Sequence, residues 1–360
     1  MNQRQKEQQE FDESGKNLIV GLATACPLKP EELAAITPDS PCVVEVFTSG
    51  LTAEVYRLRI KGNDYTLKKK REESKVQNLD GKYSFLNEVQ RRSDFQKLKD
   101  DATTAGDYQH IVPTIYADYQ MGIILSPWLE GELLQKPNQA IVSQLFSTLF
   151  ACEKAGLFEW DLCSGNMIVD EEQQLWMFDF GYMYPFNPLK ELNSNGLSDP
   201  IFQFCERFET RFLSGWIAKN ELDSDAALKL FRMVKKAALE AISQKLEWLI
   251  EQGADDTVVS HYVEMQAEYE KAVSDSDELK RRYMLDMFRS HVLDIEDDLD
   301  GKSCTSTTAL RVKAVIGMLD KHYDLLREGG GLFYQNSGKK RSELIRQYIE
   351  KSELVEEYQV

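Results

Sequence analysis

The sequence predicts an α+β fold in which strands come first and helices follow. Residues 42–70 contain three runs with the alternating, β-branched character of strands, joined by short turns. From residue 198 onward the hydrophobic pattern is almost entirely helical. Strands followed by helices are typical of α+β proteins with separate lobes. We therefore expect a small antiparallel-sheet lobe with one helix, followed by a helical lobe and a helical C-terminal extension.

The strand-rich part begins after a polar segment. Residues 1–41 are polar and then punctuated by prolines, which is typical of an arm and a connector. The turn between the first two strands falls at Thr48, Ser49 and Gly50. Residues 82–100 have their apolar side chains along one helical face, and two more strands are expected within 111–129.

An amphipathic helix is expected over residues 138–155, with Gly156 just beyond it as a C-cap. Two short strands should flank a turn at 170–173. Ser198-Asp199-Pro200 is interpreted as the start of the next helix, because proline is tolerated in a first turn. Periodic helical segments follow at 224–251, 257–299, 305–328 and about 340–357.

Composition excludes several classes of protein. The chain has 360 residues and a net charge of −17, which disfavours nonspecific nucleic-acid binding. No apolar run reaches the roughly 18 residues that a membrane span needs. The six cysteines and four histidines are scattered, so neither a zinc site nor a disulfide framework is indicated. A reducing, cytoplasmic location is the simpler interpretation, with a secreted effector left open.

The strongest functional signal lies in residues 159–181, EWDLCSGNMIVDEEQQLWMFDFG. This segment contains D-L-x-x-x-N, from Asp161 to Asn166, and then D-F-G, beginning at Asp179. Asn166 follows Asp161 by five residues, and Asp179 follows Asn166 by thirteen. Two motifs in this order, at this spacing and around a hairpin, resemble the protein-kinase-like superfamily. The resemblance covers roughly residues 42–218.

The resemblance implies ATP and Mg²⁺ as cofactors and assigns catalytic roles. Asp161 would take the proton of the acceptor hydroxyl, and Asn166 and Asp179 would hold magnesium. Lys68, in Tyr-Thr-Leu-Lys, would contact the α- and β-phosphates, and Glu88 would pair with it. Lys68 and Lys70 share one strand face and Lys69 lies on the other. The alternative interpretation is that these lysines form a solvated run of charges.

The resemblance also implies the residues that bind the nucleotide. Gly50 stands at the centre of a reduced glycine-rich loop, and Val55 would press on the adenine. The backbone of Ser126 and Trp128 would meet the adenine edge, and Glu132 would reach the ribose. The full expected set is Gly50, Thr52, Ala53, Val55, Thr66, Lys68, Ser126, Trp128 and Glu132.

The chain departs from the family pattern in two places. Glu159 and Trp160 stand where that family has the His and Arg of H-R-D, so a phosphorylated activation loop would lack its usual partner. Asp199, expected to buttress the catalytic loop, follows Asp179 by only 20 residues, and no A-P-E motif occurs. This short segment resembles that of aminoglycoside and choline kinases.

We therefore expect a two-lobed protein-kinase-like fold with four regions. These are an arm (1–41), an N-lobe (42–129), a C-lobe (130–255) and a helical extension (256–360). The expected function is an atypical protein kinase that phosphorylates a hydroxyl. A small-molecule kinase is the first alternative, and a pseudokinase or a nucleotidyl transferase on the same fold is the second. The acidic run at 294–301 does not match an EF-hand loop and is expected to be a solvated helix end.

Overall fold

The computed structural model describes residues 1–48 and 50–360, so Ser49, in the turn expected before Gly50, lies outside the described residues. The chain is α+β and divides into two compact units. The first comprises Met1–Gln135 and Gly165–Tyr184, and the second comprises Lys136–Ser164 and Pro185–Val360. Within the described ranges, no helix has both the length and the apolar character that crossing a bilayer requires.

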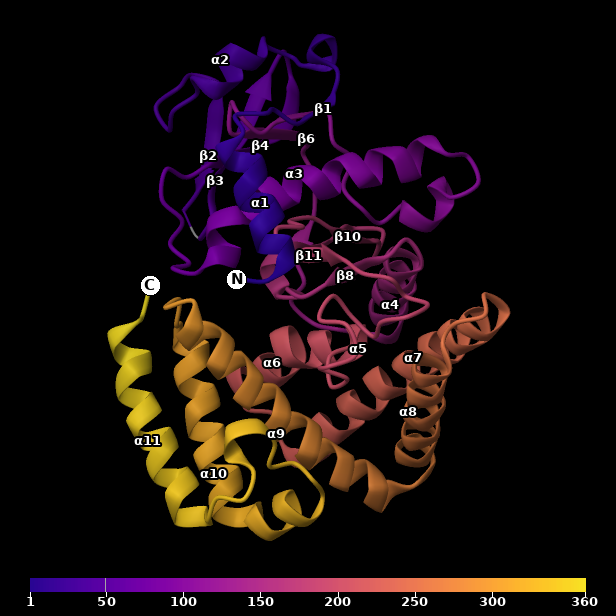
Figure 1. Cartoon of the computed structure of the whole chain (residues 1–360). Coiled ribbons are helices and arrows are strands. Elements are labelled where there is room, and N and C mark those ends of the chain that lie inside the picture. Colours follow the sequence, from indigo (N-terminus) through magenta and orange to yellow (C-terminus); the bar gives the residue numbers. More distant parts are fainter. Residues whose placement is uncertain (49) are drawn as a thin grey trace. The chain divides into compact units, whose positions relative to one another are not determined.

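The first unit is built on a six-stranded antiparallel sheet with the order β1-β5-β6-β4-β3-β2 (Figure 1). Its strands are β1 (Ile19–Gly21), β2 (Val43–Phe47), β3 (Ala53–Ile60), β4 (Asn63–Lys70), β5 (Tyr116–Asp118) and β6 (Ile123–Pro127). A smaller sheet, ordered β10-β9-β7, contains β7 (Glu132–Leu133), β9 (Met167–Val169) and β10 (Leu175–Met177). The strands expected within 42–70, within 111–129 and around the turn at 170–173 are thus confirmed.

Alternating side chains place one hydrophobic cluster on each face of the large sheet. On one face, Ile123 and Leu125 pack with Leu33 near the short helix α2 (Pro30–Ala34). On the other face, Ile124 packs with Phe85, Leu86 and Val89 of the long helix α3 (Leu79–Asp100). The sheet therefore lies between α2 and α3, and every second residue of β4 faces α3.

The polar N-terminal segment contains a helix, α1 (Gln3–Glu13), which packs against α3. Its contacts are mostly polar: Arg4 pairs with Asp80 at 2.9 Å, and Gln8 Nε2 donates to Asn87 Oδ1 at 3.4 Å. The sequence did not predict this helix, because it has no apolar face for a periodicity argument to detect.

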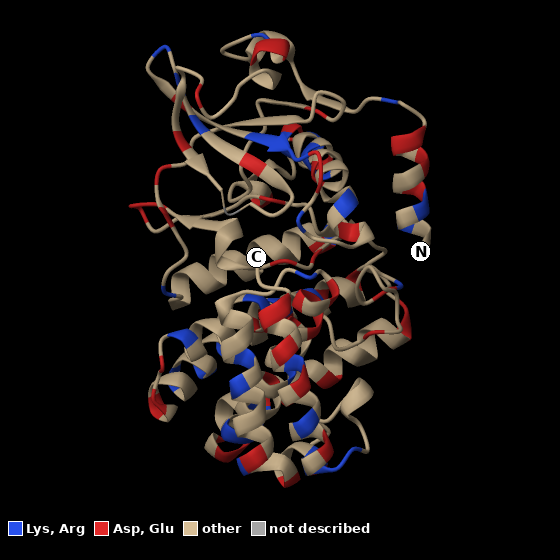
Figure 2. Cartoon of the chain, turned by 90° about the vertical axis from the view of Figure 1, so that its left-hand side faces the viewer, with Lys and Arg blue, Asp and Glu red and all other residues tan. Residues whose placement is uncertain are grey.

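The second unit is almost wholly helical (Figure 1). Its helices are α4 (Gln139–Lys154), α5 (Phe204–Phe208), α6 (Ser214–Lys219), α7 (Ser224–Glu251), α8 (Asp256–Ser274), α9 (Ser276–Asp300), α10 (Ser306–Glu328) and α11 (Arg341–Glu357). A π-helical turn, Glu209–Leu213, joins α5 to α6. The short strand β8 (Leu157–Glu159) follows α4, and β11 (Met183–Pro185) lies where the chain passes between the units. Figure 2 shows acidic and basic residues interspersed along these helices.

Two helix boundaries differ from the prediction. Ser198-Asp199-Pro200 does not start a helix. The next helix, α5, begins at Phe204, and Gln203 is its N-cap. The single segment expected at 257–299 is two helices, since the Asp275 side chain accepts hydrogen bonds from Asp277 N and Glu278 N and caps α9. Both boundaries depend on a side-chain cap, Gln203 or Asp275, and hydrophobic periodicity does not locate such caps.

Candidate active site

Lys68 lies on the sheet face that α3 covers. In the antiparallel ladders its direct partners are Val55 on β3 and Ile124 on β6, and directly opposed residues share a face. Lys69 lies on the opposite face, where its Nζ donates to the carbonyl of Ile36. Lys70 returns to the α3 face but stands at the strand end, with Nζ 3.4 Å from Tyr119 Oη.

Three residues far apart in the chain meet at the Lys68 ammonium. Its Nζ lies 2.5 Å from Glu88 Oε2 on α3 and 2.7 Å from Asp179 Oδ2. The other Glu88 oxygen accepts from Arg92 Nη2 at 2.9 Å. Burial alone would lower the pKa of Lys68, but the carboxylates of Asp179 and Glu88 raise it above its ordinary value, so Lys68 stays cationic. Arg92 was missed, although its i, i+4 position after Glu88 could have indicated it.

Asp179 has an unusual backbone and a well-fixed neighbourhood. Its φ is 68°, a left-handed conformation that Asp and Asn tolerate better than most residues. Phe180 is fully buried and its ring packs 4.8 Å from that of Phe95 on α3. Although burial would raise the pKa of Asp179, Lys68 lowers it below the ordinary range, so the carboxylate is ionised.

Asn87 ties α3 to the chain that follows Asp179. Its Nδ2 lies 3.1 Å from the carbonyl of Phe180, 3.1 Å from that of Gly181 and 2.8 Å from that of Met183. These contacts hold the helix that carries Glu88 beside the segment that carries Asp179. Asn87 was not predicted, because a single buried amide leaves no pattern in the sequence.

The β9–β10 hairpin brings Asn166 next to the Asp179 segment. Met167 pairs with Met177, and Phe178 N donates to the Asn166 carbonyl at 3.1 Å. The amide of Asn166 and the carboxylate of Asp179, which is 32% exposed, supply the hard oxygen donors that Mg²⁺ prefers. The donor chemistry of this pair therefore fits a magnesium ion that keeps further ligands from water or phosphate.

Most of the residues expected to bind nucleotide lie on the same face as Lys68. Thr66 is directly opposite Ser126, and Val55 is opposite Lys68. Ala53 shares this face but is buried in the core beneath α3, so its side chain serves packing. Glu132 lies apart from them, exposed on β7 of the smaller sheet.

Trp128 differs from its expected role. Its backbone N–H donates to the Asp64 carbonyl at 3.2 Å, which extends the β4–β6 ladder. This N–H therefore already has an acceptor within the protein. The indole instead stacks on Phe47, with ring centroids 6.0 Å apart, under Arg57. The indole Nε1 is buried and has no hydrogen-bond partner among the residues that the structure describes.

The turn before β3 is tight at Gly50. A Cβ added there would lie 2.4 Å from the Ala53 carbonyl oxygen, so only glycine fits. The Gly50 carbonyl accepts from Arg71 Nε at 3.1 Å, and the Thr52 carbonyl accepts from Arg71 N at 3.4 Å. Arg71, which directly follows β4, therefore fixes the turn before β3 through these two hydrogen bonds.

This geometry predicts unequal effects along the lysine run. With the kinase activity that the motif resemblance implies, replacing Lys68 with Met should reduce Mg-ATP turnover by about a hundredfold or more, because it removes the cation that bridges two carboxylates. Lys69→Met should change turnover by less than about threefold, since its ammonium lies on the opposite face. Steady-state kinetics of the two variants makes the comparison, and equal modest losses would support the solvated-charge alternative.

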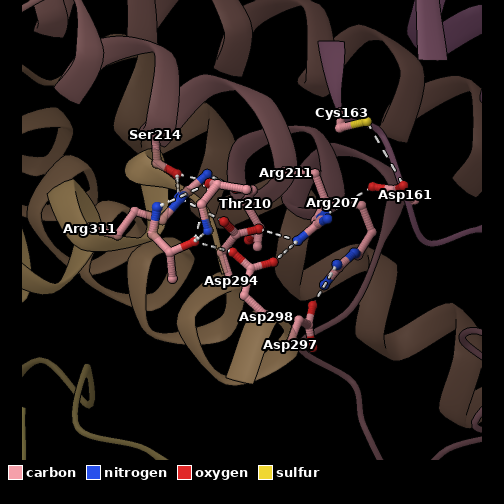
Figure 3. A network of polar contacts seen from close by, with 12 residues as sticks. Asp161, Cys163, Arg207, Thr210, Arg211, Ser214, Asp294, Asp297, Asp298 and Arg311 are labelled. Atoms are coloured by element: carbon pink, nitrogen blue, oxygen red, sulfur yellow. Dashed lines mark hydrogen bonds and ion pairs between the residues drawn. The ribbon is translucent and has the colours of Figure 1, made fainter. Parts of the chain in front are cut away.

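In the second unit, Asp161 is held by three contacts. Its Oδ1 accepts from Arg211 Nε at 3.0 Å (Figure 3). Its backbone N–H donates to Glu159 Oε1 at 2.7 Å. Cys163 Sγ lies 3.9 Å from Oδ2. Glu159 thus fixes the backbone of the segment that carries Asp161.

Asp199 is not placed as expected. Its side chain lies in a loop, where it accepts from Asn195 Nδ2 and Tyr334 Oη, each at 3.1 Å. The side chain that bonds to the Trp160 carbonyl is Arg207, whose Nε lies 3.0 Å away. Arg207 and Arg211 therefore support the segment around Asp161 instead, and nothing in the sequence pattern indicated either of them.

The acidic run is not simply a solvated helix end. Asp294 and Asp298 are only 8% and 14% exposed, whereas Asp297 is 53% exposed. No group of three or more His, Cys, Asp or Glu side chains in residues 1–48 and 50–360 is placed to hold a metal ion. The buried carboxylate of Asp294 is instead paired with Arg211 and Arg311.

Asp298 should make stability depend on pH. Burial first, and then the charge of Asp294, raise its pKa to about 7, while Arg211, Thr308 and Arg311 act in the opposite direction. Between about pH 4 and 7 the folded protein therefore holds a proton that the unfolded chain has lost, so this contribution to stability falls as pH rises and is gone above pH 7.

Asp298→Asn should remove this dependence. Thermal unfolding should show the melting temperature of the variant gaining on the wild type as pH increases from 5 to 8. A constant difference across that range would contradict the assignment.

Comparison with known proteins gives no family assignment, because neither a scan against protein-family models nor a search of curated proteins yields a match to this chain. The functional argument therefore depends on the residues and the geometry described above.

Proposed function

We propose that this protein is an ATP- and Mg²⁺-dependent phosphotransferase with a two-lobed, protein-kinase-like fold, and that it transfers the γ-phosphoryl group to a hydroxyl. The observation that carries the proposal is the pairing of Lys68 with both Glu88 and Asp179. These are the lysine, the helix glutamate and the D-F-G aspartate that the motif resemblance implies. A cation held between two carboxylates is suited to contact phosphate oxygens without losing its own position.

Trp128 supports a nucleotide on the Lys68 face. Its buried indole N–H lacks a hydrogen-bond acceptor among the described residues. A buried donor without a partner costs about 1–3 kcal/mol, so a ligand that supplies an acceptor nitrogen would be favoured there. An adenine base supplies such an acceptor nitrogen.

Asn166 and Asp179 would hold the magnesium ion. When bound, the ion would neutralise phosphate charge, which is the main requirement of phosphoryl transfer. The residues of the chain have the remaining tasks. Lys68 would bind phosphate oxygens, Gly50 would allow the backbone to approach them, and Asp161 would orient the acceptor hydroxyl and accept its proton.

The acceptor is proposed to be a protein hydroxyl, with a small molecule as the second candidate because the segment between Asp179 and Asp199 is short. Intact-mass spectrometry after incubation with Mg-ATP, alone and with cell extract, tests the class of reaction. An added phosphate supports the proposal. An added nucleotide indicates nucleotidyl transfer, and an unchanged mass with no ATP consumed indicates a pseudokinase.

Activity should not require phosphorylation between Gly181 and Asp199. Hydroxyls of this segment already have partners within their own units: Ser194 Oγ accepts from Trp160 Nε1 at 2.8 Å, and Ser198 Oγ donates to the Asn195 carbonyl at 2.8 Å. Tyr184 is buried beneath the Arg4 guanidinium.

Protein shown by mass spectrometry to be unphosphorylated should therefore be fully active. Loss of activity on phosphatase treatment, and its return with phosphate mapped to Tyr182, Tyr184, Ser194 or Ser198, would contradict this prediction.

A further inference from the structure

Arg211 connects Asp161 to the C-terminal helices. It lies in the π-helical turn Glu209–Leu213, a rare form of helix that often occurs at functional sites. Its Nε donates to Asp161 Oδ1 at 3.0 Å (Figure 3). Its Nη1 pairs with Asp294 and lies 3.7 Å from Asp298 Oδ1, both on α9. One guanidinium thus bridges the catalytic loop and a helix more than a hundred residues further along the chain.

The partner of Arg211 is itself fixed. Asp294 Oδ2 lies 2.6 Å from Arg311 Nε, so this carboxylate joins two arginines. Arg311 is buried on α10, where it donates to Ser214 Oγ at 2.6 Å and to the Thr210 carbonyl at 2.8 Å. Each link in this chain of ion pairs is therefore held by a further polar contact within the same unit (Figure 3).

A second arginine repeats the connection one helical turn earlier. Arg207 Nε donates to the Trp160 carbonyl, and its Nη2 lies 3.2 Å from Asp297. Arg207 and Arg211 are four residues apart, and Asp294, Asp297 and Asp298 have the i, i+3, i+4 spacing that places side chains on one helix face. The acidic face of α9 is therefore complementary to a pair of arginines that both hold the catalytic loop.

We propose that Arg211 is a positioning residue for Asp161, and that the acidic face of α9 makes the C-terminal helices part of the catalytic machinery. The proposal rests on the phosphotransferase function proposed above. Burial would lower the pKa of Arg211, but Asp294, Asp161 and Asp298 raise it well above its ordinary value, so its charge is permanent. The planar guanidinium contacts Asp161 through one nitrogen and α9 through another, which fixes the carboxylate in one orientation.

A lysine cannot reproduce this bridge, because a single ammonium replaces two separated nitrogens. Arg211→Lys should keep the charge and the fold but misplace Asp161, and misplacement by about 1 Å costs about a hundredfold in turnover. The loss should appear in kcat, while KM for ATP should change by less than about threefold, since the nucleotide residues belong to the first unit.

A double-mutant cycle with Asp161→Asn tests whether Arg211 acts through Asp161. In the Asp161→Asn background, Arg211→Lys should reduce Mg-ATP turnover by less than about twofold. The matched control is Arg282→Lys, whose arginine pairs with Asp286 in the same unit and is similarly buried, at 22% against 20% for Arg211. This control should keep wild-type kcat.

Several results would overturn the proposal. These are wild-type or increased kcat in Arg211→Lys, an equal loss in the Asp161→Asn background, or an equal loss in the control. Thermal unfolding of each variant identifies any that are destabilised. Asp294→Ala is a second variant, which should also lose kcat because it removes the oxygen that accepts from Nη1 of Arg211, and wild-type kcat there would refute the role of α9.

Failure of the underlying function gives a different result. If the wild type shows no turnover, or if Asp161→Asn retains it, the phosphotransferase assignment fails and the positioning role fails with it. If Asp161→Asn loses turnover and Arg211→Lys does not, only the positioning role fails.

Discussion

Asp179→Asn is expected to reduce Mg-ATP turnover by about a thousandfold, because a metal ligand contributes several kcal/mol of charge stabilisation. Asparagine keeps the size of the side chain and tolerates the left-handed conformation at this position, where φ is 68°. The substitution therefore removes the charge opposite Lys68 while keeping the shape. Glu88, still paired with Lys68 and Arg92, would hold the lysine in place.

Asp170→Asn provides the matched control in the same unit. Asp170 lies in the β9–β10 turn, where Oδ1 accepts from Gln174 N at 2.8 Å and Oδ2 accepts from Trp176 Nε1 at 2.9 Å, so asparagine keeps one of the two acceptor oxygens. The turnover of the Asp170→Asn variant should stay within about threefold of that of the wild type. Wild-type turnover of Asp179→Asn at saturating Mg-ATP would show that the D-F-G assignment is wrong.

Asp161→Asn should be about as damaging as Asp179→Asn. Loss of a positioned proton acceptor costs about a hundredfold to ten-thousandfold in rate. ATP affinity should be unchanged, because the predicted nucleotide residues lie in the first unit and Asp161 lies in the second. Steady-state turnover and equilibrium binding of a fluorescent ATP analogue, measured on the same preparation, separate the two effects.

Asp277→Asn controls for removal of a carboxylate from the second unit. Asp277 is on α9 and its side chain is 95% exposed. The turnover and the ATP binding of the Asp277→Asn variant should therefore match those of the wild type. If Asp161→Asn lost ATP affinity and turnover in equal proportion, a role confined to the acceptor hydroxyl would be refuted.

Hydrophobic periodicity predicted the strands and long helices whose apolar residues recur at the spacing of a strand or a helix. The α7 helix spans Ser224–Glu251 as expected, and β3 alternates in burial from Tyr56 to Ile60. The start of α5 and the break before α9 were missed, because they depend on side-chain caps at Gln203 and Asp275 rather than on hydrophobic spacing.

The candidate site was only partly predictable. The spacing of motifs selected Lys68, Glu88 and Asp179, and the structure brings these three side chains together. Arg211 and Asn87 could not be predicted, because each acts across 50 or more residues through one polar contact that requires the folded backbone. Such contacts leave no period and no motif in a single sequence.

The proposed reaction transfers the γ-phosphoryl group of ATP to a hydroxyl. The most direct measurement compares ATP labelled at the γ-phosphate with ATP labelled at the α-phosphate, incubated with the wild type or Asp179→Asn in the presence of magnesium and cell extract whose own kinases have been inactivated by heat. Our account predicts label transfer from γ-labelled ATP alone, and only with the wild type. Transfer of the α-label, or γ-transfer that persists in Asp179→Asn, would contradict it.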